Sequence, residues 1–75
     1  MNKERRKSLQ DIINRLYTIS DELTELQEQE QECYDNMPEG IQQSDRGCEI
    51  EEKADALSDA CDDLSDLISN LEDIL

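Results

Sequence analysis

Apolar residues recur along the chain at steps of three and four, the spacing of one face of an α-helix. In the first half, one column recurs every seven residues at Leu9, Leu16 and Leu23. A second column lies three residues after the first and consists of Ile12, Ile19, Leu26 and Cys33. Two apolar columns per heptad are typical of a coiled-coil seam. The pattern therefore predicts a helix over residues 3–36.

The second half repeats this pattern and widens it. Its seam consists of Ile50, Ala54, Leu57, Cys61, Leu64, Ile68, Leu71 and Leu75. A further column beside this seam consists of Ala60, Leu67 and Ile74. A two-stranded coil uses two apolar positions in seven, whereas a bundle helix uses three. We therefore predict a helix over residues 45–75 that packs against more than one neighbour.

A linker at residues 37–44 separates the two halves. Pro38 is expected to end the first helix near Asn36, because a proline disfavours helical backbone in the residue before it. Ser44 and Asp45 are both good N-caps for the second helix, whereas Gly47 weakens its first turn. A short linker makes the helices antiparallel neighbours. The chain is thus predicted to be a single all-α domain, an antiparallel two-helix hairpin of coiled-coil type that associates into a helical bundle.

The position of the linker also predicts a register. With its centre near Gly40, facing residues have numbers that sum to about 80, so that Leu16 lies opposite Leu64 and Ile19 opposite Cys61. Glu30 interrupts the first seam near Ile50. Either this polar residue fixes the register and the oligomeric state, or the helices separate near the linker and Glu30 is solvated.

The core of a 75-residue chain that is 35% hydrophobic is marginal, and its only aromatic residues are two tyrosines. Small scaffolds are usually reinforced by disulfides, a metal or self-association. We expect self-association, as a dimer or a larger oligomer. The residues assigned to the core seam or to the oligomer contact are Leu9, Ile12, Leu16, Ile19, Leu23, Leu26, Ile50, Leu57, Leu64, Leu67, Ile68, Leu71 and Ile74.

The net charge is −14, and its distribution is uneven. Residues 1–20 are basic overall, whereas residues 21–75 carry 19 acids against Arg46 and Lys53. Such a chain is repelled by nucleic acids and by anionic membranes and is attracted to basic protein surfaces. The acids either mimic a nucleic acid or simply keep the protein soluble. The candidate contacts to a protein partner are Asp55, Asp59, Asp62, Asp63, Asp66, Tyr34 and Ile41, although capping the end of the bundle is the favoured role for Tyr34 and Ile41.

Residues for other chemistry are scarce. The chain has no histidine, so we expect no enzyme activity, and no spacing of cysteines or acids matches a metal site. No cofactor is expected.

The three cysteines are interpreted as reduced seam residues, and the absence of an apolar leader or a membrane-spanning run favours the cytoplasm. The basic first residues are expected to pair with the acidic C-terminus. Alternatively, Arg5, Arg6 and Arg46, brought together by oligomerisation, hold a phosphorylated small ligand.

The linker Asn36-Met37-Pro38-Glu39-Gly40-Ile41-Gln42-Gln43-Ser44-Asp45-Arg46 resembles that of small acidic helical-hairpin proteins encoded by bacteriophages and prophages. The resemblance implies the cytoplasm of an infected bacterium and assigns no functional residues. Small acidic phage proteins are often inhibitors of host factors, including defence systems. The expectation is a non-enzymatic interaction module that inhibits a host protein by covering its surface. The alternatives are a structural bundle whose only partner is itself and an oligomer that sequesters a phosphorylated ligand.

Overall fold

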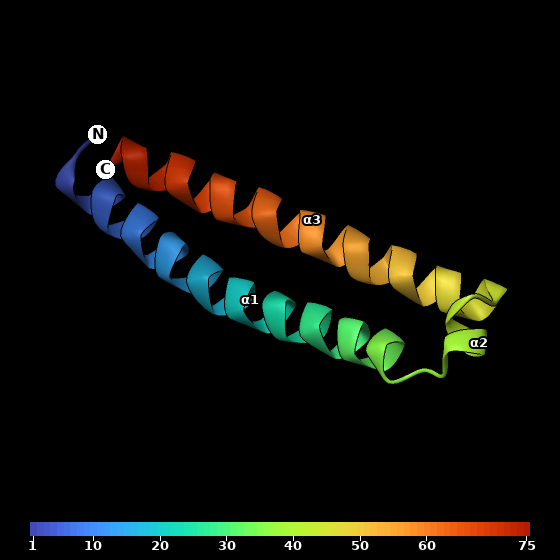
Figure 1. Ribbon diagram of the computed structural model, residues 1–75. Helices are drawn as coiled ribbons and strands as arrows, with labels where there is room; N and C mark the ends of the chain where they lie inside the picture. Colours follow the sequence, from blue (N-terminus) through green and yellow to red (C-terminus); the bar gives the residue numbers. More distant parts are fainter.

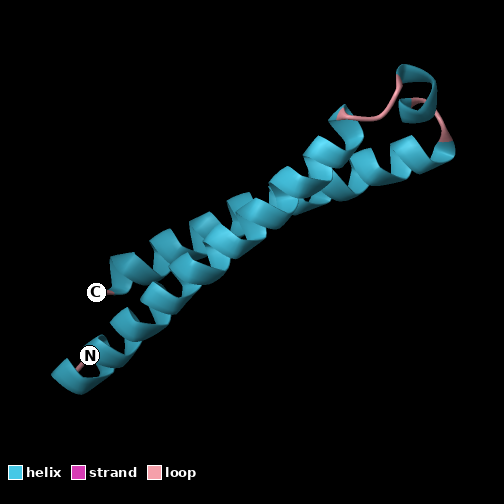
Figure 2. Ribbon diagram, turned by 90° about the horizontal axis from the view of Figure 1, so that it is seen from below, coloured by secondary structure: helices cyan, strands magenta, loops and turns pink.

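The computed structural model describes residues 1–75 as two long helices and one short helix. The helices are α1 (Lys3–Asp35), α2 (Glu39–Gln42) and α3 (Asp45–Ile74). α1 and α3 pack side by side, the two termini lie together at one end of the molecule, and α2 lies at the other end (Figure 1). The result is a rod of 58 × 15 × 12 Å whose loops are confined to one end (Figure 2). The predicted all-helical fold with two long packed helices is confirmed.

Each long helix begins at a side-chain cap. The side chain of Asn2 accepts a hydrogen bond from the Arg5 backbone N–H at 2.8 Å. At α3, the Ser44 hydroxyl accepts from the Gly47 backbone N–H at 3.3 Å, so Ser44, and not Asp45, is the cap. Such caps satisfy N–H groups that have no partner within the helix. α1 ends at Asp35, close to the position that Pro38 predicts.

α2 was not expected from the sequence, and Gly47 explains how it fits. The backbone of α2 crosses the first turn of α3 so closely that a Cβ atom on Gly47 would overlap the carbonyl oxygens of Ile41 and Gln42. Gln42 also donates from its side chain to the backbone carbonyl of Tyr34 at 2.9 Å, which ties α2 to the end of α1. Gly47 is therefore a contact surface for α2 and not only a weak first turn.

The register of α1 against α3 differs from the predicted one. Thr24 was expected to face residue 56, but its hydroxyl donates to the sulfur of Cys61 at 3.9 Å. This is a shift of about five residues, and it also separates Ile19 from Cys61 and Leu16 from Leu64. The physical reason is α2, which covers the first turn of α3 and so displaces the end of α1 along it.

The interface between α1 and α3 follows a regular heptad pattern. Only three apolar residues, Ile13, Ala54 and Ile68, are fully buried. On α1 the buried and half-buried positions of the seam are Leu9, Ile13, Leu16, Ser20, Leu23, Gln27, Glu30 and Tyr34, and Met37 continues the pattern just after the helix. On α3 they are Ile50, Ala54, Leu57, Cys61, Leu64, Ile68 and Leu71.

The second column of the α1 seam is thus not the predicted one. Ile12, Ile19 and Leu26 were placed in the contact with α3, but their exposed fractions are 41%, 49% and 51%. The column one residue later lies in the contact instead, although it includes the polar residues Ser20 and Gln27. Helix α1 is therefore turned so that its more apolar column faces away from α3.

The role of Gly47 leads to a stability prediction. Gly47→Ala should lower the free energy of unfolding by about 1–3 kcal/mol, because the new methyl group would collide with rigid backbone in α2. Gly40→Ala is the matched control, since a Cβ atom at Gly40 meets nothing within 4 Å. That control should be neutral or slightly stabilising, because alanine favours the helix. Urea unfolding followed by circular dichroism measures both, and equal effects would contradict the packing described for α2.

Candidate interaction surfaces

One side of the rod carries an apolar face. This face consists of Ile12, Ile19, Leu26 and Cys33 from α1 and Ala60, Leu67 and Ile74 from α3. All seven residues are exposed, and in each helix they recur every seven positions. Leu67 and Ile74 remain 48% and 55% exposed. Five of them, Ile12, Ile19, Leu26, Leu67 and Ile74, are residues that the sequence assigned to the core seam or the oligomer contact, and the α1–α3 contact leaves them uncovered.

The two halves of the apolar face lie on the same side of the rod. Both helices use equivalent heptad positions for their mutual contact, and they run in opposite directions (Figure 1). In that geometry the remaining apolar column of each helix turns to the same side. A pocket supports the arrangement. It is lined by Leu26 from the apolar column of α1 and by Lys53, which occupies the same heptad position of α3 as Ala60, Leu67 and Ile74. The face is therefore continuous across both helices.

The pocket lies toward the linker end of the apolar face. It has a volume of about 590 Å³ and is lined by Leu26, Glu30, Glu49, Ile50, Lys53, Ala56 and Leu57. Glu30 is half-buried at its edge, so the polar interruption of the seam coincides with an opening between the helices. Most of the pocket lining is apolar, and the charged groups in it are the carboxylates of Glu30 and Glu49 and the ammonium group of Lys53.

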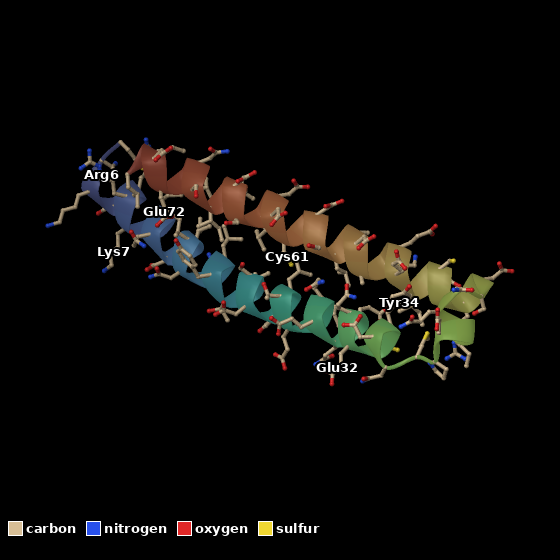
Figure 3. All side chains as sticks on the ribbon, in the orientation of Figure 1. Arg6, Lys7, Glu32, Tyr34, Cys61 and Glu72 are labelled. Atoms are coloured by element: carbon tan, nitrogen blue, oxygen red, sulfur yellow. The ribbon has the colours of Figure 1, made fainter.

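The opposite side of the rod is polar. The Tyr17 hydroxyl donates to a carboxylate oxygen of Glu72 at 2.9 Å, and one heptad later Thr24 contacts Cys61. Figure 3 shows Glu72, Cys61 and Tyr34 at successive levels along the rod. Hydrogen bonding to Glu72 raises the pKa of Tyr17, and hydrogen bonding to Glu51 raises the pKa of Tyr34. A carboxylate that accepts a hydrogen bond from a phenol favours the protonated phenol.

Acidic side chains line the outer sides of both helices. On α3, Asp55, Asp59, Asp62 and Asp66 are all exposed and lie on the helix surface turned away from α1. Their counterparts on the outer side of α1 are Asp21, Glu25, Glu28, Glu32 and Asp35, of which Glu32 is labelled in Figure 3. We call these two sets the acidic sides. Asp63 is different, because its helical position places it at the edge of the apolar face.

The other predicted contact residues are divided between the two ends of the rod. Tyr34 is half-buried in the seam, whereas Ile41 is 46% exposed on α2. Tyr34 therefore belongs to the packing between the helices, and Ile41 stays open to solvent. Arg5 and Arg6 begin α1, whereas Arg46 lies beside α2 at the other end of the 58 Å rod. A single chain does not bring these three arginines together into a phosphate site.

The cysteines and acids form no metal centre. No group of three or more cysteine, histidine, aspartate or glutamate residues is arranged to hold a metal ion. All three cysteines are free thiols, and only Cys61 lies in the seam, whereas Cys33 and Cys48 are exposed. The interpretation of all three as seam residues is therefore wrong for two of them. No helix is long and apolar enough to cross a membrane.

The seam contains residues that sequence reasoning did not assign to it. Ser20 and Gln27 lie in it one residue after the members of the expected apolar column. The signal that could have identified them is Ile13, which lies four residues after Leu9 and three before Leu16, the spacing of a seam position, and which the structure buries fully. The chain matches no protein-family model, and no curated protein or solved structure is significantly similar to it.

The tyrosine contacts have a consequence at alkaline pH. A tyrosine whose pKa is higher in the folded chain than the usual 10 contributes stability below pH 10, and this contribution is lost as the pH rises through the folded-state pKa. We therefore expect the rod to lose stability above pH 10, and Tyr17→Phe to reduce that loss. Ultraviolet titration of the phenolates in Tyr17→Phe and Tyr34→Phe separates the two groups. A midpoint at 10 for both remaining tyrosines would contradict the contacts.

Proposed function

We propose that the chain is a non-enzymatic protein-interaction module of the phage type, an antiparallel hairpin that associates with copies of itself and covers a basic surface of a host protein. The observation that carries this proposal is the division of the rod into an apolar face and two acidic sides. The apolar face supports self-association, because apolar patches on small soluble proteins usually contact another protein. The acidic sides support binding to a surface of opposite charge.

The charge density of the acidic sides supports competition with a nucleic acid. Residues 21–75 contain 19 acids, and the rod is 58 Å long, which corresponds to roughly one acid per 3 Å. Two rods side by side would carry roughly one per 1.5 Å, compared with about 1.7 Å per charge along duplex DNA. An assembly of this kind would attract the basic protein surfaces that normally bind DNA or RNA. Its site of action would be the cytoplasm of the bacterial host.

An affinity experiment tests the host-protein part of this proposal. The tagged protein is incubated with bacterial lysate at about 50 mM and about 500 mM salt, and the retained proteins are identified by mass spectrometry. We expect a host protein that is retained at low salt, released at high salt and displaced by added duplex DNA. Screening weakens contacts between exposed charges, and DNA would compete for the same basic surface.

The matched variant replaces four aspartates on the outer side of α3 by asparagine, namely Asp55, Asp59, Asp62 and Asp66. These residues are exposed, so the fold should be retained while capture is lost. A variant with Asp21, Glu25, Glu28 and Glu32 changed to amides reports whether the acidic side of α1 contributes equally. Retention of the same protein by both variants, or at high salt, would contradict a charge-driven contact. Recovery of the bait alone would favour a purely structural bundle.

A further inference from the structure

The rod exposes more surface than a compact protein of the same mass. The chain exposes 5697 Å² of surface, whereas a compact protein of 8.7 kDa exposes about 4,700 Å². The excess is about 1,000 Å², close to the roughly 800 Å² that each partner contributes to a standard interface. The helices also place Ser20 and Gln27 in their mutual contact while Ile19 and Leu26 face outward. Packing α1 through Ser20 and Gln27 is favourable only if the column that contains Ile19 and Leu26 is also covered.

We propose that the apolar face packs against the same face of a second copy, with the linker ends of the two rods pointing in opposite directions. The two-fold axis passes through Ile19 on α1 and through Leu67 on α3. This inference rests on the self-association proposed above and does not depend on the identity of any host protein. The contact is isologous, so every pairing in it occurs twice.

The residues of the face fit this axis layer by layer. With the axis at Ile19, the midpoint of α1, this residue meets its own counterpart, and Ile12 of one copy lies over Leu26 of the other. The axis then crosses α3 near Leu67, because Thr24 contacts Cys61 and so residue 19 is level with residue 66. On that helix, the small Ala60 of one copy lies opposite the large Ile74 of the other. Pairing a small with a large side chain allows the layers to interdigitate.

Charges at the edge of the face select the orientation. Arg15 and Glu22 occupy the same edge of α1, one heptad apart and on either side of Ile19. Opposed rods place Arg15 of each copy beside Glu22 of the other, which is attractive. Rods with both linkers at the same end would instead set Glu22 beside Asp63 of the other copy, which is repulsive. Like charges placed opposite each other disfavour that alternative.

The ends of the rod agree with the same orientation. The first turn of α1 carries Lys3, Arg5 and Arg6, whereas the pocket at the linker end carries Glu30 and Glu49. In the opposed arrangement Arg5 of one copy lies at the level of Cys33 of the other, beside those carboxylates. The parallel arrangement would bring the two basic ends together instead. The charges at the ends of the rod and the charges at the edge of the apolar face therefore favour the same dimer, in which the two rods are opposed.

Disulfide trapping tests the axis directly. In a background with Cys33, Cys48 and Cys61 changed to alanine, Ile19→Cys should form a covalent dimer of about twice 8.7 kDa under mild oxidation. Leu67→Cys should behave likewise, because the axis also passes through that position. Glu25→Cys is the matched control, since it is exposed on the outer side of α1 and should remain monomeric on denaturing gels. The background variant must first show the same mass by light scattering as the parent.

Charge exchange tests the orientation without cysteines. Arg15→Glu should weaken the dimer about tenfold or more, because it sets two carboxylates side by side on both sides of the two-fold axis. Adding Glu22→Arg should restore the dimer, since the pair is then reversed and again attractive. Analytical ultracentrifugation gives both dissociation constants, and circular dichroism verifies that the helices are retained. Failure of the second change to rescue the first would overturn the opposed orientation.

The outcomes separate this inference from the rest of the proposed function. A monomeric mass at about 100 µM with intact helices would overturn the dimer and the self-association, while salt-dependent capture of a host protein would still support the acidic sides as a contact. A dimeric mass in which a disulfide forms only in mixtures of Ile19→Cys and Leu67→Cys would overturn the axis and favour parallel rods. Trapping by Ile19→Cys alone, together with rescue by the charge exchange, would support the proposal.

Discussion

The contact between α1 and α3 can cover only one side of each helix, and this geometric limit determines most other properties of the molecule. Each helix carries three apolar or partly apolar columns, yet only two of them fit between a single pair of helices. Three apolar residues are fully buried, which is little for a chain of this length. The third column of each helix must therefore meet solvent or another protein.

The orientation of α1 decides how the uncovered columns are arranged. Had α1 packed through Ile12, Ile19 and Leu26, one rod would have buried more apolar surface, but the uncovered columns of the two helices would have lain on opposite sides. Packing through Ile13 and Ser20 places both uncovered columns on one side and joins them into a single face. The internal contact is less apolar as a result, and the external face is wider. An assembly of two rods would bury the wider face and so gain stability, whereas an isolated rod would leave that face in contact with water.

The sequence predicts the elements of this fold better than the relations between them. Helix position, the ends at Asp35 and Ser44, and the apolar columns all follow from local patterns, namely heptad spacing, Pro38 and a capping side chain. The register of α1 against α3 does not follow from a local pattern. It depends on the packing of α2 against Gly47, and no repeat in the sequence marks that contact. The choice between the Ile12 column and the Ile13 column for the seam is likewise not local, since both recur at the spacing of a helix face and the structure buries the less apolar of the two. Sequence reasoning could thus identify the residues of the apolar face but not the side on which they meet.

The two kinds of contact proposed for this chain should respond to salt in opposite ways. Two chains of charge −14 repel each other overall, even where Arg15 and the basic first turn provide local attraction. Screening at physiological ionic strength, where the Debye length is about 8 Å, weakens this repulsion between distant acidic sides while the apolar contact remains. Binding of the acidic sides to a basic protein is weakened by the same screening. Self-association would then persist under conditions that release a charged partner, and the apolar face and the acidic sides would act as separate functions of one short rod.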